Sequence, residues 1–230
     1  MEALVEVSDL KVCYGAFQAV RGVSFGLAPG EILGIVGESG SGKSTIARTL
    51  IGLEKPVGGT IAVRAKSMQM VFQDAVGSLN PRMTVRQTLE EVIAVKRTRQ
   101  NPHDLLARVG LSEAVLDQYP REMSGGQCQR ISVARALACE PEVLIADEPV
   151  SALDVSVQAR VLNLLRDLRR ELGLAILLIA HDLAVVKNVC DRICVMERGR
   201  FVDAGPAEAV FANPTSDYTK RLLAAVPRLR

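Results

Sequence analysis

The pattern of apolar and polar positions alternates between short buried strands and longer amphipathic helices along most of the chain. Continuous apolar runs at residues 31–36, 143–146 and 174–180 are typical of buried strands. Apolar residues at helical spacing follow at 46–51, 127–139 and 155–172. Strands that alternate with helices in this way predict an α/β fold whose sheet is mainly parallel.

Other stretches add to this expected architecture. Residues 1–30 alternate apolar and polar side chains and predict a small N-terminal antiparallel β-layer, and further strands are expected at 60–63, 68–72, 194–196 and 200–202. The segment 75–120 changes to a helical pattern, with helices expected at 85–95 and 102–109 between turns. We interpret this segment as a helical insertion in the α/β fold.

A glycine loop between the strand at 31–36 and the following helix has the spacing of a phosphate-binding site. Its residues are Gly37, Glu38, Ser39, Gly40, Ser41, Gly42, Lys43, Ser44 and Thr45. They match G-x-x-x-x-G-K-[ST], in which glycines allow positive φ and the helix N-terminus attracts an anion. We expect Lys43 to reach the β- and γ-phosphates of a nucleotide and the Ser44 hydroxyl to bind Mg²⁺. A glycine-rich turn without a ligand is the alternative.

Two adjacent carboxylates follow the apolar strand at 143–146. Asp147 and Glu148 lie at its carboxyl end, where ligands gather in open α/β sheets. We expect Asp147 to hold Mg²⁺, and Glu148, pointing to the opposite side, to accept a proton from an attacking water. An acidic turn before Pro149 is the structural alternative.

A second helix end in the sequence has the same physical character. Ser124 can cap the helix at 127–139, and Gly125 and Gly126 before Gln127 leave backbone N–H groups exposed to an anion.

Tyr14 stands out because only 3% of residues are aromatic. By pattern alone it is equally a packed tyrosine or a surface on which a nucleobase stacks.

In their order along the chain, these features resemble the nucleotide-binding domain of ATP-binding-cassette (ABC) transporters, a phosphate-loop, RecA-like fold. The matching positions are the phosphate loop, Gln73, residues 124–127, 143–148 and 151–154, and His181. The resemblance implies that the chain binds and hydrolyses ATP with Mg²⁺. It also implies a head-to-tail dimer in which the Ser124 helix end of one subunit completes the ATP site of the other.

The resemblance further implies roles for single residues. Tyr14 is similar to the adenine-stacking aromatic, Gln73 to the residue that links nucleotide and Mg²⁺ to the membrane partner, Asp154 to the dimer-contact aspartate, and His181 to the γ-phosphate switch. The chain would be one domain, with an ATP-binding core at 1–74 and 127–205, a helical subdomain at 75–126 and a C-terminal tail at 206–230.

A narrower resemblance is to the ATPase subunits of dipeptide, oligopeptide and nickel importers. It is carried by residues 72–74, 78–82 and 151–158 and by Asn213, Pro214, Tyr218, Thr219, Leu222 and Leu223. In such importers two identical or related ATPases lie beneath two transmembrane permease subunits, and an extracytoplasmic binding protein delivers the substrate. The chain would then lie peripherally on the cytoplasmic face of the inner (plasma) membrane. One departure is the interval of only 30 positions between Lys43 and Gln73, which predicts a shortened β-layer.

Composition and charge limit the kinds of partner and cofactor that the chain can be expected to bind. The net charge of +2 without a long Lys or Arg block argues against nucleic acid, although a soluble ABC ATPase acting on nucleic acid or ribosomes remains the alternative. No apolar run reaches the roughly 18 to 20 residues of a membrane span, and we expect no signal peptide. Five cysteines without a C-x-x-C pair predict free thiols and no structural metal.

Overall fold

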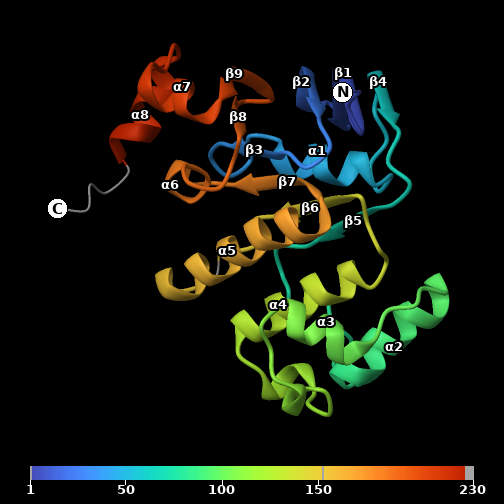
Figure 1. The fold of residues 1–230 in the computed structure, drawn as a ribbon. Coiled ribbons are helices and arrows are strands. Elements are labelled where there is room, and N and C mark those ends of the chain that lie inside the picture. The colour runs from blue at the N-terminus through green and yellow to red at the C-terminus, as the bar shows by residue number, and fades with distance from the viewer. Residues whose placement is uncertain (1, 152, 226–230) are drawn as a thin grey trace.

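Two β-sheets and a group of helices make up the computed structural model, which describes residues 2–151 and 153–225 (Figure 1). The larger sheet has six strands in the order β5-β6-β7-β3-β8-β9. Its strands are β3 (Ile32–Val36), β5 (Met68–Val71), β6 (Val143–Asp147), β7 (Ala175–Ala180), β8 (Arg192–Glu197) and β9 (Arg200–Pro206). Only the edge strand β9 is antiparallel to its neighbour. The predicted α/β fold with a mainly parallel sheet is confirmed.

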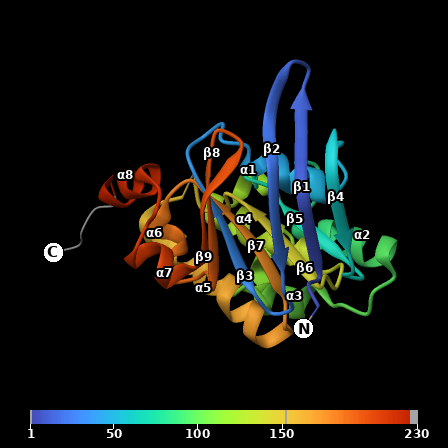
Figure 2. The ribbon, with the colours of Figure 1, turned by 90° about the horizontal axis from the view of Figure 1, so that it is seen from above.

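A second, three-stranded antiparallel sheet covers one face of the first. Its order is β2-β1-β4, from β1 (Val5–Tyr14), β2 (Phe17–Leu27) and β4 (Gly58–Val63). Figure 2 shows β1 and β2 as a long hairpin that projects beyond the rest of the molecule. The run predicted at 60–63 is therefore part of this layer and pairs with β1.

The central sheet separates two hydrophobic cores. Every residue of β3, β6 and β7 is buried, as their continuous apolar runs predict. Successive side chains enter opposite cores: Leu33 packs toward the antiparallel layer and α1 (Lys43–Leu50), whereas Ile32 packs toward the helices on the other face. This double burial fixes the strands whose carboxyl ends carry the candidate site.

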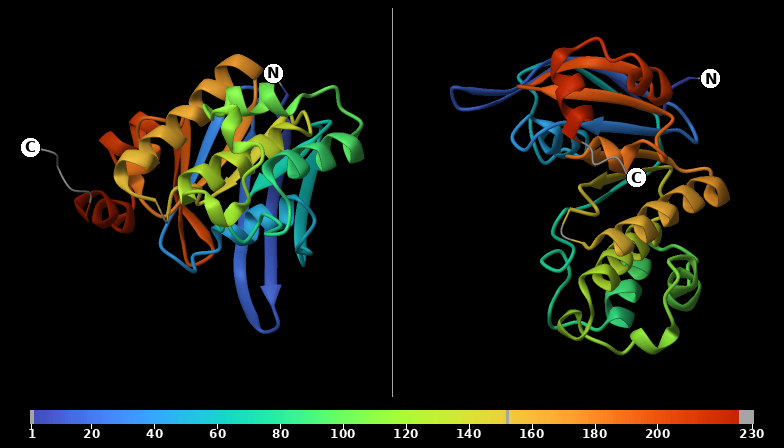
Figure 3. Two further views of the ribbon diagram at one scale, coloured as in Figure 1. Left: turned by 90° about the horizontal axis from the view of Figure 1, so that it is seen from below. Right: turned by 90° about the vertical axis from the view of Figure 1, so that its left-hand side faces the viewer.

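The helices between β5 and β6 form a distinct group at one end of the molecule, seen in the right-hand view of Figure 3. They are α2 (Val85–Lys96), α3 (Pro102–Arg108), the 3₁₀ turns Glu113–Val115 and Pro120–Glu122, and α4 (Gly125–Leu137). The long helix α5 (Val155–Leu172) packs against α4, and its bounds are those predicted. No helix in the described ranges is long and apolar enough to cross a membrane.

Three short helices lie between residues 183 and 225, where no helix was predicted. They are α6 (Leu183–Val186), α7 (Ala207–Ala212) and α8 (Asp217–Ala225). Helix α8 buries Tyr218 and Thr219 and packs beside β9. Helices α6 and α7, of four and six residues, are too short for a clear period, whereas α8 is amphipathic and could have been recognised from its pattern.

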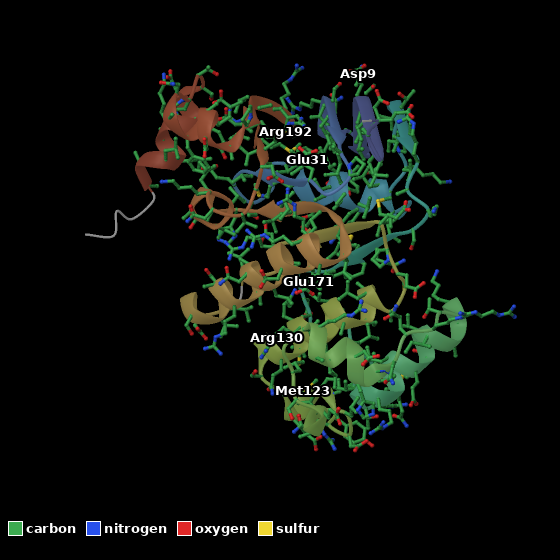
Figure 4. The ribbon with its side chains drawn as sticks, in the orientation of Figure 1. Asp9, Glu31, Met123, Arg130, Glu171 and Arg192 are labelled. Atoms are coloured by element: carbon green, nitrogen blue, oxygen red, sulfur yellow. The ribbon has the colours of Figure 1, made fainter. Side chains whose placement is uncertain are left out.

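An ion pair fixes the end of the central sheet opposite the candidate site. Arg192, at the start of β8, lies 3.0 Å from Glu31, which immediately precedes β3, and Figure 4 shows the two residues together. The Asp191 carboxylate accepts a 2.8 Å hydrogen bond from the Ile32 N–H. Both contacts hold the amino ends of β3 and β8 in register, because the parallel strands share that edge.

Candidate functional site

The loop between β3 and α1 has a geometry that only glycine allows at two positions. Gly42 has φ of 110°, and a Cβ atom there would lie 2.5 Å from the Ala19 carbonyl oxygen. A Cβ atom at Gly37 would overlap the Met196 carbonyl oxygen. Close packing against β2 and β8 therefore requires the glycines of the phosphate-loop motif.

Lys43 begins α1 with its ammonium group turned into this loop. Its side chain is 3% exposed, and Nζ donates hydrogen bonds to Gly37 O at 2.7 Å and Glu38 O at 2.9 Å. Burial lowers the pKa of Lys43, and the nearby carboxylates of Glu148 and Asp147 oppose that shift. The loop thus encloses a cation together with the first N–H groups of a helix, the surroundings that bind an anion.

Ser44 and Asp147 provide oxygen atoms beside this cation. The Ser44 hydroxyl donates a 2.8 Å hydrogen bond to Asp147 Oδ1, and Asp147 is 3% exposed at the carboxyl end of β6. Burial raises the pKa of Asp147, and the Ser44 hydrogen bond opposes this. No cluster of three or more His, Cys, Asp or Glu side chains suited to a metal occurs in residues 2–151 and 153–225. One carboxylate and one hydroxyl fit a Mg²⁺ ion whose other ligands are phosphate and water.

Glu148 follows β6 and brings a second carboxylate to the same place. Its φ of 45° is outside the extended region, and its N–H bonds to the Ile179 carbonyl of β7 at 3.0 Å. Its Oε1 lies 3.8 Å from Lys43 Nζ. The expectation that Glu148 points away from the side of Asp147 assumed regular strand alternation, which the positive φ of Glu148 interrupts; Glu148 faces Lys43, and Asp147 bonds to Ser44.

Two further predicted residues contact the Glu148 carboxylate. Gln73, just after β5, donates from Nε2 to Glu148 Oε2 at 3.0 Å and approaches Ser151 Oγ at 3.4 Å. His181, just after β7, places Nδ1 3.7 Å from the same Glu148 oxygen. The ends of three neighbouring strands thus bring an amide, an imidazole and a carboxylate together, although 75 positions separate Gln73 from Glu148.

One pocket brings Tyr14, Gln73 and Glu148 together with part of the phosphate loop. It is lined by Tyr14, Phe17, Ala19, Ser39, Gly40, Gly42, Lys43, Ser44, Thr45, Gln73 and Glu148. Tyr14 is 42% exposed, and its hydroxyl lies 3.5 Å from Thr45 Oγ1. Tyr14 is therefore a rim residue with an accessible ring, not a core residue. Phe17, 59% exposed, was missed, although it ends the same β1–β2 turn.

The Ser124 helix end lies outside this pocket. The Ser124 hydroxyl accepts a hydrogen bond from Gln127 N–H at 3.3 Å, and Gln127 Oε1 accepts one from Ser124 N–H at 2.9 Å. This capping box leaves Ser124 and Gly125 exposed. A Cβ atom at Gly126 would lie 2.6 Å from Val157 Cγ1, so glycine allows α4 to pack closely on α5. Gly125 lines a separate hollow that also includes Gln73 and Glu148.

Asp154 also lies away from the Lys43 pocket and caps α5. Its carboxylate accepts hydrogen bonds from Ser156 Oγ at 2.7 Å and Val157 N–H at 3.0 Å. The Ser156 hydroxyl, followed by the Val157 N–H, lowers the pKa of this exposed carboxyl. The within-chain geometry of Asp154 is thus that of a helix cap.

Comparison with known proteins agrees with this geometry. A family model described as ABC transporter matches residues 20–151. The oligopeptide transport ATP-binding protein OppF of Salmonella typhimurium is 45% identical over 261 aligned positions, which cover 98% of this chain and 78% of that protein. The dipeptide transport ATP-binding protein DppF of Escherichia coli is 44% identical, with 99% and 78% covered.

Solved structures show the same fold. CbiO1 from Clostridium perfringens, part of the ABC transporter complex cbiONQ, has a TM-score of 0.80 at 29% identity and covers 93% of this chain and 92% of its own. The cassette MJ0796, a dimer bound to ADP and Pi in a post-hydrolysis state, has a TM-score of 0.78 at 26% identity, with 88% and 98% covered. The family match, the relatives and the fold together identify this nucleotide-binding chain as an ATPase of the ABC transporter family.

Proposed function

We propose that this chain is the ATP-hydrolysing subunit of a peptide importer and that the Lys43 pocket is its catalytic site. The observation that carries the proposal is the convergence of Lys43, Ser44, Asp147 and Glu148 within direct or near contact. Lys43 would stabilise negative charge on the β- and γ-phosphates. Glu148 would take a proton from the attacking water, and His181 would hold the γ-phosphate.

Mg²⁺ would be held by the Ser44 hydroxyl and the Asp147 carboxylate, with Gln73 as a further ligand. When bound, the ion supplies positive charge that neutralises phosphate oxygens. Two features support this assignment: the 2.8 Å contact that already brings the two oxygens together, and the position of Gln73 on the same pocket. The Tyr14 ring would stack on the adenine, which is consistent with its exposure at the pocket rim.

Two copies, or this chain and a related ATPase, would form a head-to-tail dimer. The Ser124 helix end and Asp154 are exposed and lie outside the Lys43 pocket, so within one chain they are free to serve the site of another. Backbone N–H groups at the start of α4 would bind the γ-phosphate held by the second cassette. The dimeric state of MJ0796 supports this arrangement.

The relatives support a peptide cargo, and the resemblance to peptide importers supports the proposed membrane partners. OppF and DppF are ATP-binding proteins of oligopeptide and dipeptide transport, and each is covered over most of its length. By this likeness the chain would lie on the cytoplasmic face of the plasma membrane, beneath two permease subunits. An extracytoplasmic binding protein would deliver the substrate to those subunits. ATP hydrolysis here would drive alternating access in those subunits, with dipeptides or oligopeptides as the cargo.

The test is the steady-state ATPase rate of the purified chain with Mg²⁺ against protein concentration, beside Glu148→Gln. The rate per chain is expected to rise with concentration, because each site needs two cassettes. Glu148→Gln should retain ATP binding and lose at least about 100-fold in kcat. Glu171→Gln, which changes an exposed carboxylate at the end of α5 (Figure 4), is the matched control and should hydrolyse at the wild-type rate.

Each other outcome has a definite meaning. A Glu148→Gln variant that turns over at the wild-type rate would refute the role of Glu148. Tight ATP binding without turnover at any concentration would show that the second half of each site comes from another ATPase or requires the membrane subunits. Reconstitution with candidate permeases and ATP-dependent uptake of a labelled dipeptide or oligopeptide then tests the cargo.

A further inference from the structure

The C-terminal helix α8 reaches the phosphate loop through one side chain. Tyr218 is 5% exposed, and its hydroxyl accepts a 2.9 Å hydrogen bond from the Glu38 N–H, 180 positions away. Figure 1 shows α8 at the far end of the colour scale, next to α7, and α8 also contacts β9. Tyr218 belongs to the importer-like tail motif, whose role the ATP site does not otherwise explain.

The contact acts on the peptide unit that also holds Lys43. The N–H of Glu38 and the carbonyl of Gly37 belong to one peptide group, and this carbonyl accepts the 2.7 Å hydrogen bond from Lys43 Nζ. Because a peptide group is planar, fixing its N–H fixes the direction of its carbonyl. Hydrogen bonds on both ends of one peptide group also polarise and strengthen each other. The Tyr218 hydroxyl is therefore linked to the Lys43 ammonium through a single rigid unit.

Helix α8 is itself anchored, so Tyr218 is held in place. The Asp203 carboxylate of β9 accepts hydrogen bonds from Thr215 N–H at 3.1 Å and Ser216 N–H at 3.0 Å, just before α8 begins. Arg221 covers the Tyr218 ring, with Cζ 5.9 Å from the ring centroid. The Asp203 contacts tie the start of α8 to β9, so movement of the helix would be passed on to the tyrosine.

A second hydrogen bond from the part of the chain that follows β8 holds the phosphate loop at Ser41. Gly199, in the turn between β8 and β9, donates from its N–H to Ser41 O at 2.9 Å. The Glu38 and Ser41 ends of the loop are therefore each fixed by an element that follows β8 in the chain. A glycine-rich loop has large conformational freedom, and fixing it before ATP arrives reduces the ordering cost of binding.

We propose that Tyr218 is a positioning residue of the ATP site, whose hydroxyl holds the Gly37–Glu38 peptide and thereby orients Lys43 for the phosphates. The inference rests on the proposed function, since it assumes that Lys43 binds ATP. It gives the C-terminal helix a part in nucleotide affinity although α8 contributes no group that contacts the nucleotide.

The test compares wild type with Tyr218→Phe, which removes the hydroxyl and keeps the ring in its packed place. Leaving the Glu38 N–H without a partner is expected to raise the Kd and KM for ATP about three- to tenfold and to change kcat by less than about twofold. Tyr119→Phe removes a hydroxyl from the helical group, far from the loop, and should leave both constants unchanged. Asp203→Asn should raise KM in the same direction by loosening the start of α8.

Separate measurements of KM and kcat for Tyr218→Phe distinguish a positioning role of Tyr218 from a purely structural one. If Tyr218 only stabilised the fold, Tyr218→Phe would lower the melting temperature and the active fraction, hence kcat per chain, and leave KM unchanged; that result would overturn the inference. Equal ATP affinity in Tyr218→Phe and wild type would also overturn it, while ATP turnover by the wild type would leave the proposed function standing. If the wild type bound no ATP, both proposals would fail.

Discussion

The Ser44 hydroxyl donates a 2.8 Å hydrogen bond to Asp147 across 103 positions of sequence, joining the first turn of α1 to the carboxyl end of β6. The contact brings two oxygen atoms together beside the buried Lys43 ammonium. Burial raises the pKa of Asp147 because it disfavours the charged carboxylate. A cation bound beside the carboxylate would counteract this effect and favour the ionised form. The pair is therefore arranged to receive a cation together with the phosphates.

Ser44→Ala tests the pair as a Mg²⁺ site. Removing the hydroxyl deletes one proposed ligand and leaves Asp147 without its hydrogen-bond donor. The Mg²⁺ concentration for half-maximal ATPase rate is expected to rise at least about tenfold. Ser67→Ala, which removes a hydroxyl at the other end of the sheet beside Cys139, is the control. An unchanged Mg²⁺ dependence in Ser44→Ala would exclude Ser44 as a ligand.

Gly42→Ala tests whether loop geometry limits nucleotide binding. The added Cβ atom meets both an unfavourable φ of 110° and the Ala19 carbonyl at 2.5 Å, so the loop must move. We expect ATP affinity to fall at least about tenfold, together with a loss of about 1 kcal/mol or more in the free energy of unfolding. The measurements are ATP titration and thermal unfolding.

Gly173→Ala is the matched control for that experiment. Gly173 ends α5 with φ of 67°, and no atom lies within 4 Å of a Cβ atom built there. The Gly173→Ala variant places an alanine at positive φ, as Gly42→Ala does. The new Cβ atom, however, meets no other atom and lies away from the Lys43 pocket. The melting temperature of this variant should fall while its ATP affinity stays at the wild-type value. If both variants kept full affinity, the tight approach of Gly42 to Ala19 would not matter for binding.

His181→Ala separates the hydrolytic step from binding. His181 Nδ1 lies 3.7 Å from Glu148, and the half-exposed imidazole is free to contact the γ-phosphate. We expect kcat to fall about 100-fold, because a donor to the developing charge is lost, with ATP affinity largely kept. His103→Ala is a suitable control, since that imidazole is similarly exposed and pairs with Glu113 on the helical group. Wild-type turnover in His181→Ala would refute this role.

The sequence predicted those parts of the molecule that local patterns determine. Strands β3, β6 and β7 are buried on both faces, so their continuous apolar runs were recognisable. Helix α5 has a long amphipathic pattern, an Asp154 cap and Gly173 at its end, and its bounds were correct. The phosphate loop was recognisable because packing and φ restrict its glycines to fixed spacing.

What the sequence did not predict depends on contacts between distant segments. The direction of Glu148 follows from a positive φ and a hydrogen bond to Ile179, which strand alternation cannot foresee. The pairing of β4 with β1 joins segments about 50 positions apart, and no local signal assigns its sheet. Tyr218 reaches the phosphate loop because α8 packs on β9, a long-range contact that no local pattern in the sequence signals.

Asp203→Asn tests how α8 is anchored, through the pH dependence of stability. Burial alone would raise the pKa of Asp203, but hydrogen bonds from Thr215 and Ser216 together hold it below its ordinary value. A carboxyl whose folded-state pKa is lowered stabilises the fold above its unfolded pKa, about 3.9, and this contribution disappears as pH falls through the lower folded value. We therefore expect Asp203→Asn to melt several degrees below wild type at pH 7.

The difference between the two melting temperatures should shrink as pH falls below about 4, because the unfolded chain then binds a proton at Asp203 and the folded protein follows at its lower pKa. Asp167→Asn changes an exposed carboxylate of α5 and should match the wild type across this range. A constant gap at all pH values would mean that the asparagine disturbs packing rather than the charged hydrogen bonds. If the variant also shows weaker ATP binding at pH 7, where the carboxylate is ionised, the anchor of α8 and the phosphate loop are coupled through Tyr218.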